Sequence, residues 1–143
     1  MIQRDLSIAH RAYVAGLIDG EGTIGIFTKT EQFQVMVAAT DPRLIAWLLE
    51  NVGGRAWAIN RYSNPKPTHK HLLRWGFSGR HGCMWLLAQI KDYLVIKREQ
   101  ADLMQQANAV IEGQLDEFGR GKNKPPGLLD GFRVQFRALN KRG

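Results

Sequence analysis

At 143 residues, 44% of them hydrophobic, the chain is long enough for one compact domain with a real core, and a second independent domain is not expected. The formal net charge of +7 and the pI near 9.9 favour a polyanionic partner, although a solvated basic surface or tail gives the same balance. The single cysteine, Cys83, rules out an internal disulfide and a cysteine-type zinc site.

The N-terminal segment carries no targeting or membrane signal. Its short apolar stretch is followed at positions 19–22 by alternating acids and glycines. A signal cleavage site needs small neutral residues, and a membrane span needs about 20 apolar ones. We therefore expect a soluble intracellular protein with no signal peptide, no transmembrane segment and no membrane partner.

The first predicted element is a helix over residues 9–20. Ala12, Gly16 and Gly20 recur at intervals of four and form a side with almost no side chains. Glycine costs about 1 kcal/mol in a helix interior, so such a stripe indicates that another backbone approaches closely. Two interpretations stay open here, because the helix could pack against a second chain or tightly against its own sheet.

A hairpin follows the helix, with its turn near residues 29–32. The residues Thr23, Gly25, Phe27 and Lys29 alternate with Ile24, Ile26 and Thr28, and then Gln32, Gln34 and Met36 alternate with Phe33, Val35 and Val37. This period of two is typical of strands with two different faces. One face is aliphatic and suits a core, while the other is mixed and suits either water or a ligand.

A helix and a second hairpin are predicted next. Thr40-Asp41-Pro42 is typical of a helix start and Gly53-Gly54 of its end. Strands are expected over residues 55–62 and 71–78, joined by the turn-rich segment 63–70. On the returning strand Leu73, Trp75 and Phe77 should face inward, which leaves Lys70, Leu72, Arg74 and Gly76 on the same side as Arg55 and Arg61. Positive charge thus collects on one sheet face.

Helices are predicted over residues 83–91 and 94–112. Residues 120–127, RGKNKPPG, have the composition of a linker, and a short amphipathic basic stretch covers 128–139. We therefore expect a single domain over residues 1–119 and, over 120–143, a linker with a basic C-terminal segment that forms a short helix or a disordered tail.

Residues 14–22, VAGLIDGEG, resemble the LAGLIDADG motif in its GLIDGEG form, and only one copy is present. The element order over roughly residues 9–112 is also similar to that of the single-motif LAGLIDADG homing endonucleases. The resemblance implies an α+β fold with an αββαββα core, a saddle-shaped antiparallel sheet for DNA, and C-terminal helices. It implies an intron-encoded endonuclease that hydrolyses both strands of a long, pseudo-palindromic double-stranded DNA site.

The resemblance assigns metal binding and catalysis to Glu21, assisted by the backbone carbonyl of Gly20. The physical logic is that a helix ending at this point delivers two hard oxygen ligands, which suit Mg²⁺ when DNA and a second chain complete the coordination. It implies Mg²⁺ as cofactor, with Mn²⁺ as a substitute and Ca²⁺ bound without cleavage. Asp19 matches the first acid of the motif, which is mainly structural in the family.

Two basic residues are further catalytic candidates. The stretch over residues 93–101 resembles the family segment that carries a basic residue into each active site, which points to Lys97. A cation there can organise the hydrolytic water and offset charge on the phosphate, although a surface role in phosphate binding is the alternative. Arg43 matches the family arginine at the start of the middle helix, but Ala39 stands where some members have glutamine, so the water-positioning network must differ.

A single motif implies a homodimer, in which two motif helices pack on a two-fold axis. The predicted interface residues are Ala12, Ala15, Gly16, Asp19 and Gly20. The polar sheet face should then read DNA in the major groove, since arginine and glutamine pair bidentately with guanine and adenine. The predicted DNA-binding residues are Thr23, Phe27, Lys29, Gln32, Gln34, Arg55, Trp57, Arg61, Lys66, Lys70 and Arg74.

A second functional hypothesis is a non-cleaving nucleic-acid-binding protein on the same scaffold, such as an intron RNA maturase or a transcriptional regulator. Such a protein would have no chemical need for the acid at Glu21. The two hypotheses therefore differ in what Glu21→Gln should do: it should abolish cleavage in a nuclease and leave a binding protein intact.

Overall fold

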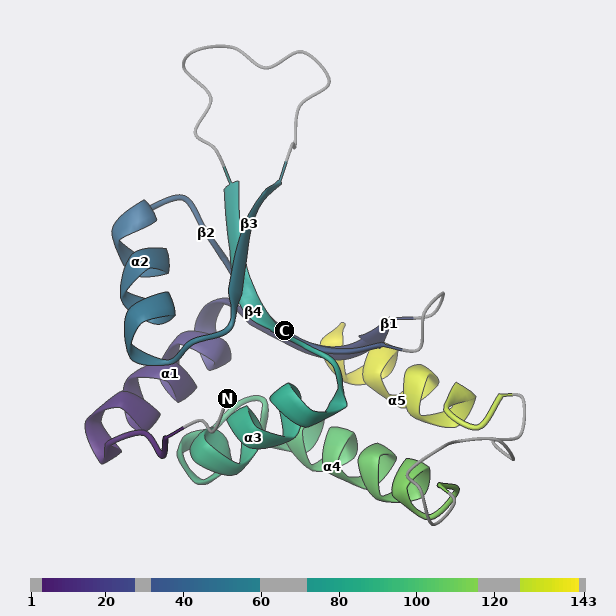
Figure 1. Ribbon diagram of the computed structural model, residues 1–143. Coiled ribbons are helices and arrows are strands. Elements are labelled where there is room, and N and C mark those ends of the chain that lie inside the picture. Colours follow the sequence, from purple (N-terminus) through teal and green to yellow (C-terminus); the bar gives the residue numbers. More distant parts are fainter. Residues whose placement is uncertain (1–3, 28–31, 60–71, 116–126, 142–143) are drawn as a thin grey trace, which may run out of the picture.

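A computed structural model of the chain describes residues 4–27, 32–59, 72–115 and 127–141 (Figure 1). The chain begins with helix α1 (Ile8–Glu21), followed by strands β1 (Gly22–Phe27) and β2 (Gln32–Ala39) and by helix α2 (Pro42–Asn51). Strands β3 (Arg55–Ile59) and β4 (Leu72–Ser78) form the second hairpin. Helix α3 (Arg80–Ile90), the 3-10 turn η1 (Lys91–Tyr93), helix α4 (Arg98–Glu112) and helix α5 (Asp130–Asn140) complete the described elements.

The four strands form one antiparallel sheet in the order β1-β2-β4-β3. Successive strands pair as hairpins, β1 with β2 and β3 with β4, and β2 joins β4 at the centre. Strands β1 and β3 are therefore the edges. This is the α+β order of elements that the sequence predicted, with the loop of the first hairpin (28–31) and the segment 60–71 outside the described residues.

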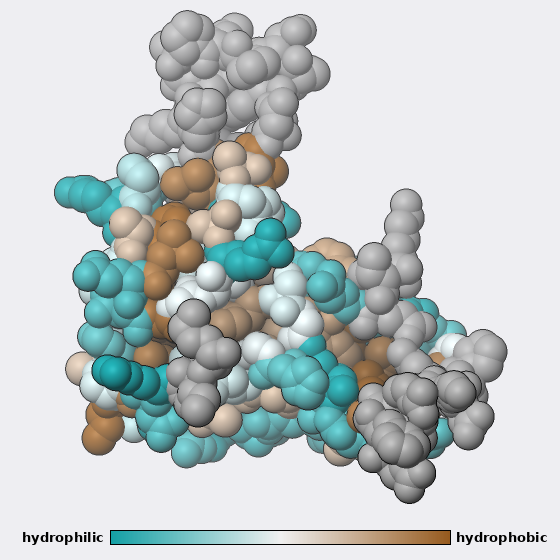
Figure 2. Space-filling view, viewed as in Figure 1, coloured by the Kyte–Doolittle hydropathy of each residue, from teal (hydrophilic) through white to brown (hydrophobic). Residues whose placement is uncertain are grey.

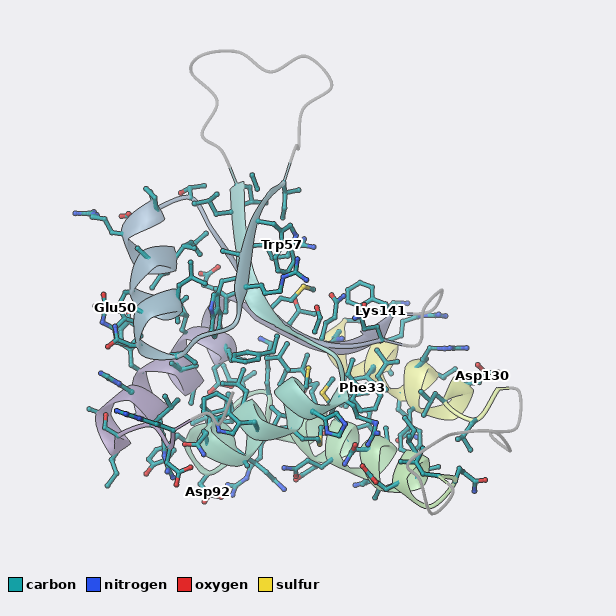
Figure 3. All side chains as sticks on the ribbon, in the orientation of Figure 1. Phe33, Glu50, Trp57, Asp92, Asp130 and Lys141 are labelled. Atoms are coloured by element: carbon teal, nitrogen blue, oxygen red, sulfur yellow. The ribbon has the colours of Figure 1, made fainter. Side chains whose placement is uncertain are left out.

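The register gives the sheet one apolar and one mixed face. Thr23 pairs with Met36, Met36 with Gly76, and Gly76 with Arg55, so these residues form a row across the mixed face. The predicted inward direction of the returning strand is confirmed, because Trp75 is fully buried, Phe77 is buried and Leu73 packs on the core. Figure 3 shows Trp57 on one side of the sheet and Phe33 on the side of the helices.

The core lies between the apolar sheet face and helices α1, α2, α3 and α4. Its fully buried large side chains come from every one of these elements: Val14, Ile18, Ile24, Val35, Val37, Leu48, Trp75, Leu86, Leu87, Ile90 and Met104. The indole of Trp75 also donates to the carbonyl of Gly53 at 2.7 Å, which ties the sheet to the turn after α2. Gly53 and Gly54 have φ of 99° and 83°, the left-handed conformation that glycine permits.

The C-terminal part of the chain contains the short helix that the sequence left open. Helix α5 packs against α4 and lies alongside β1 (Figure 1). Its Phe136, together with Leu129 just before it, is buried in the same core as the rest of the chain. Among the residues that the structure describes, no helix is long and apolar enough to cross a membrane.

Two helix starts differ from the sequence prediction. Helix α3 begins at Arg80 rather than at residue 83, since Gly79 with φ 93° turns the chain out of β4 directly into the helix. Helix α4 begins at Arg98 rather than at residue 94. Leu94 has an extended backbone, and the N–H groups of residues 95–97 donate to the carboxylate of Asp19 on α1.

Replacing Gly76 with alanine should destabilise the fold. An added Cβ would lie 2.2 Å from the carbonyl oxygen of Val35 and 2.9 Å from Cα of Met36, so the backbone of β2 must move. We expect Gly76→Ala to lower the free energy of unfolding by about 1–3 kcal/mol in urea titrations. The matched control is Gly131→Ala, where an added Cβ has nothing within 4 Å. A neutral Gly76→Ala would show that β2 and β4 are not packed as described.

Candidate active site

The motif helix α1 ends where its acidic residue is needed. Its start is capped by Ser7, whose hydroxyl accepts from the N–H of His10 at 3.2 Å. At its end the chain passes directly into β1 at Gly22, where a Cβ would lie only 2.7 Å from Cα of Ile18. Only glycine fits this junction between helix and strand. Glu21 is thereby fixed at the foot of α1, immediately before the edge strand.

The other acid of the motif, Asp19, binds the chain that leads into α4. Its carboxylate accepts hydrogen bonds from the N–H groups of Val95 at 2.8 Å, Ile96 at 3.1 Å and Lys97 at 2.9 Å. A negative charge at this position also complements the positive end of the α4 dipole. Asp19 is therefore a structural residue, in line with the role that the sequence resemblance gave it.

Lys97 is brought to the foot of α1 by the same contact. Its ammonium Nζ donates to the backbone carbonyl of Asp19 at 2.8 Å. Residue 19 thus holds Lys97 twice, through the side-chain carboxylate and through its own carbonyl. The two candidate catalytic residues Glu21 and Lys97 come from opposite halves of the sequence, and this double contact is what brings them together.

A cavity of about 360 Å³ opens between these elements. Its walls come from the α1–β1 junction, from the start of α4 and from the end of α5, and the lining residues are Gly20, Glu21, Gly22, Thr23, Ile96, Lys97, Glu99, Gln100, Leu139 and Asn140. Glu21 is exposed, and its carboxylate makes no hydrogen bond or ion pair with any residue that the structure describes. An unpaired acid facing a cation across a cavity is suited to bind a further charged group.

The donors at this cavity suit a hard divalent cation. The Glu21 carboxylate and the carbonyl of Gly20, one of the last carbonyls of α1, are both oxygen ligands of the kind that Mg²⁺ prefers. Within the described ranges no three His, Cys, Asp or Glu residues gather to form a complete metal site. The residues present therefore fit Mg²⁺ as a partial site, which substrate oxygens and a second chain would complete.

Arg43 is not part of this cavity. Its guanidinium pairs with Asp41, the N-cap of α2, with Nη2 2.7 Å from Oδ2, and its side chain is 89% exposed. The hydrogen bond with Asp41 and the nearby carboxylate charge raise the pKa of Arg43 above its ordinary value. Within a single chain, Arg43 does not meet Glu21 and Lys97.

The single cysteine takes no part in the site. Cys83 of α3 is fully buried, and its thiol lies 3.4 Å from the carbonyl of Phe77. Burial raises the pKa of this thiol to about 12. Cys83 therefore stays protonated at neutral pH and serves as a small core residue.

The mixed sheet face carries every predicted DNA-binding residue that the structure describes. They are Thr23 and Phe27 on β1, Gln32 and Gln34 on β2, Arg55 and Trp57 on β3, and Arg74 on β4. Figure 2 shows the surface hollowed between the column of α2, β3 and β4 and the lobe that carries β1. The remaining predicted residues, Lys29, Arg61, Lys66 and Lys70, lie outside the described residues.

The small-residue stripe of α1 is open within the chain. Ala12, Gly16 and Gly20 are exposed, and a Cβ on either glycine would have nothing within 4 Å. The interpretation that this stripe packs on the chain's own sheet is therefore wrong. Ala15, which the sequence predicts to lie in the dimer interface, is instead fully buried in the chain's own core and has no surface for a partner.

Sequence reasoning missed two apolar residues beside this stripe. Val95 is 84% exposed and Ile96 is 65% exposed, in the loop that Asp19 holds against the end of α1. The sequence pattern places both residues in the predicted helix over residues 94–112, and that prediction does not indicate that their side chains are exposed. The signal available in the sequence was two β-branched residues directly before a basic pair, which is a poor pattern for a helix start.

Comparison with known proteins gives structural matches alone, since neither a protein-family model nor a curated protein matches the sequence. The homing endonuclease I-CvuI, solved with the I-CreI target in the presence of Mg and with DNA not cleaved, matches with a TM-score of 0.66 and 17% identity. The match covers 92% of this chain and 82% of that one. The archaeal intron-encoded homing endonuclease I-Vdi141I, in complex with DNA, matches with a TM-score of 0.67, 13% identity and coverage of 94% and 84%.

A third match is the LAGLIDADG meganuclease I-AabMI bound to uncleaved DNA, with a TM-score of 0.56 and 21% identity. It covers 82% of this chain but only 43% of that one. The chain thus has the fold of the LAGLIDADG homing endonucleases, as its motif predicted.

Replacing Asp19 with asparagine tests the structural role of this acid. The variant keeps the shape of the side chain but loses the charge that three backbone N–H groups share. We expect the free energy of unfolding to fall by about 1.5–3 kcal/mol in thermal or urea unfolding. Asp92→Asn is the matched control, because Asp92 is 89% exposed and its ion pair with Arg98 is long at 3.6 Å. Equal effects of both variants would contradict the assignment.

Proposed function

We propose that this protein is a site-specific, metal-dependent endonuclease that cuts both strands of double-stranded DNA as a homodimer. The observation that carries the proposal is the cavity at the foot of α1, where the unpaired carboxylate of Glu21 and the ammonium of Lys97 line the same space. This cavity lies next to a sheet face that presents Gln32, Gln34 and Arg74. The same fold in DNA-bound homing endonucleases supports the DNA partner.

Three residues that line the cavity, Gly20, Glu21 and Lys97, have a chemical task in this proposal. Glu21 and the carbonyl of Gly20 hold the cation. When bound, Mg²⁺ supplies electrostatic stabilisation of the charge that develops on the scissile phosphate. Lys97, held in place by Asp19, orders the attacking water and offsets the same negative charge from the other wall. Arg43 would join the site only if the pair with Asp41 opened to reach a phosphate.

The homodimer is supported by surfaces that one chain leaves uncovered. Ala12, Gly16 and Gly20 present bare helix backbone, and Val95 and Ile96 add exposed apolar side chains beside it. Packing two copies of α1 along this stripe would place both cavities near the two-fold axis, one for each DNA strand. The match to less than half of I-AabMI leaves room in that chain for a second copy of the fold.

DNA recognition in this proposal uses the mixed face of the sheet. Two antiparallel hairpins from each chain would lie in the major groove, where glutamine and arginine side chains reach base edges. Thr23, Phe27, Gln32, Gln34, Arg55, Trp57 and Arg74 share that face in the described residues. The exposed aromatic rings of Phe27 and Trp57 are suited to pack on base methyl groups and sugars.

The decisive experiment is a cleavage selection on a randomised double-stranded DNA library with Mg²⁺, run with wild type and Glu21→Gln. We expect wild type to cut a long, nearly palindromic site. Glu21→Gln should cut the same site at least about 100-fold more slowly, because a metal ligand is lost. In Ca²⁺, wild type and Glu21→Gln should bind the selected site with dissociation constants that agree within about twofold, since the contacts to the DNA backbone and bases are unchanged.

Glu50→Gln on α2 is the matched control, because Glu50 is exposed and does not line the cavity (Figure 3). It should cut like wild type. If neither wild type nor Glu21→Gln cuts while both bind nucleic acid, the protein is a binding protein and RNA becomes the ligand to test.

Gly16→Leu tests the dimer interface. Nothing in the chain lies within 4 Å of a Cβ at Gly16, so the variant should fold, but its side chain would separate two close-packed helices. We expect the dimer dissociation constant to rise by about 10- to 100-fold in sedimentation experiments, the equivalent of about 1–3 kcal/mol of overpacking. Gly131→Leu, at an equally open helical glycine on α5, should leave the dimer dissociation constant unchanged. Unchanged dimers of Gly16→Leu would rule out α1 as the interface.

A further inference from the structure

The end of helix α5 forms the third wall of the Glu21 cavity. Leu139 and Asn140 line it together with the α1–β1 junction and the start of α4. The sequence predicts for residues 120–143 a linker with a basic C-terminal segment, as a short helix or a disordered tail, and indicates no role for them at the cavity. The last residue of α5, Asn140, nevertheless lies at the cavity that Glu21 and Lys97 line.

Asn140 connects three elements through one amide group. Its Nδ2 donates to the carbonyl oxygen of Ile24 on β1 at 3.3 Å. Its Oδ1 accepts from Nε2 of Gln100 on α4 at 3.5 Å. An amide side chain can do both at once, because it carries an NH₂ donor and a carbonyl acceptor at its end. Asn140 therefore bridges the edge strand and α4 from outside the sheet.

Both bridged residues lie close in sequence to a proposed catalytic residue. Ile24 is three residues after Glu21, and Gln100 is three residues after Lys97, one turn further along α4. Gln100 is only 6% exposed, and Asn140 is its hydrogen-bond partner among the described residues. A buried amide needs such a partner, so the position of Gln100 depends on Asn140.

We propose that Asn140 is a positioning residue that sets the distance between Glu21 and Lys97. By holding the Ile24 carbonyl on one side and the Gln100 amide on the other, it fixes the two walls that carry the carboxylate and the ammonium. This inference rests on the nuclease activity proposed above. It gives α5 a role in cleavage that is distinct from DNA binding, since Asn140 acts through residues of the protein and contacts no reacting atom.

The test is single-turnover cleavage of the selected DNA site at saturating protein, with Asn140→Ala. Asn140 is an exposed helix-end residue, so the variant should still fold, with a lower melting temperature because Gln100 and the Ile24 carbonyl each lose a hydrogen bond. We expect the cleavage rate to fall about tenfold and the Mg²⁺ concentration for half-maximal rate to rise about tenfold, because Glu21 and Lys97 lose their relative position. The dissociation constant for DNA in Ca²⁺ should stay within about twofold.

Two further variants separate positioning from a general structural effect. Gln135→Ala removes another exposed amide from α5, away from the cavity, and should behave as wild type. Gln100→Ala should slow cleavage like Asn140→Ala, and the double variant should be no slower than the slower single one, because both remove the same bridge.

The outcomes distinguish the two proposals. A wild type that does not cleave overturns the proposed function and this inference with it. A wild type that cleaves while Asn140→Ala shows the same rate and Mg²⁺ dependence overturns this inference alone. Additive effects of Gln100→Ala and Asn140→Ala would also overturn it, because independent residues do not form a bridge.

Discussion

The geometry of the site depends on one contact, in which the carboxylate of Asp19 accepts hydrogen bonds from the N–H groups of residues 95–97. It joins the end of α1 to the start of α4, although Asp19 and Lys97 are 78 residues apart in the sequence. Charge-assisted hydrogen bonds of this kind are about twice as strong as neutral ones. The three N–H groups lie directly before α4, which begins at Arg98, and the carboxylate of Asp19 supplies their acceptor. The same contact holds Lys97 at the cavity that Glu21 also lines, while Val95 and Ile96 stay exposed.

The sheet imposes the second constraint, because its strand period of two sorts side chains onto faces that cannot mix. The rows that cross β1, β2, β4 and β3 put apolar residues, among them Trp75 and Phe77, against the helices, and glutamine and arginine side chains on the other side. The edge position of β1 has a separate consequence, because an edge strand has backbone groups that no neighbouring strand binds. The amide of Asn140 binds one of them, the carbonyl of Ile24, where the end of α5 lines the Glu21 cavity.

The patterns in the sequence predicted the parts of the fold that depend on local periodicity. The hairpin faces, the Asp41 cap of α2 and the glycine stripe of α1 all follow from spacing along a single element. The parts that failed depend on contacts between distant residues. The chain before α4 is bound by Asp19, 78 residues before Lys97, and the burial of Ala15 depends on the packing of α1 on the core. Asn140 had no local pattern at all, since its role arises only when α5 meets β1.

The glycines of α1 show that the helix is built for something other than the stability of one chain. Gly16 and Gly20 each cost about 1 kcal/mol relative to alanine, yet nothing in the chain occupies the space where a Cβ would stand. Close approach of a second backbone would offset that cost, and the motif helix would then carry the interface along its side and Glu21 at its foot. Any rotation of α1 against its partner would move both Glu21 carboxylates at once. In the proposed dimer, the packing of α1 on its partner therefore determines both the assembly and the positions of the two Glu21 carboxylates. Larger residues at positions 16 and 20 would prevent this close packing.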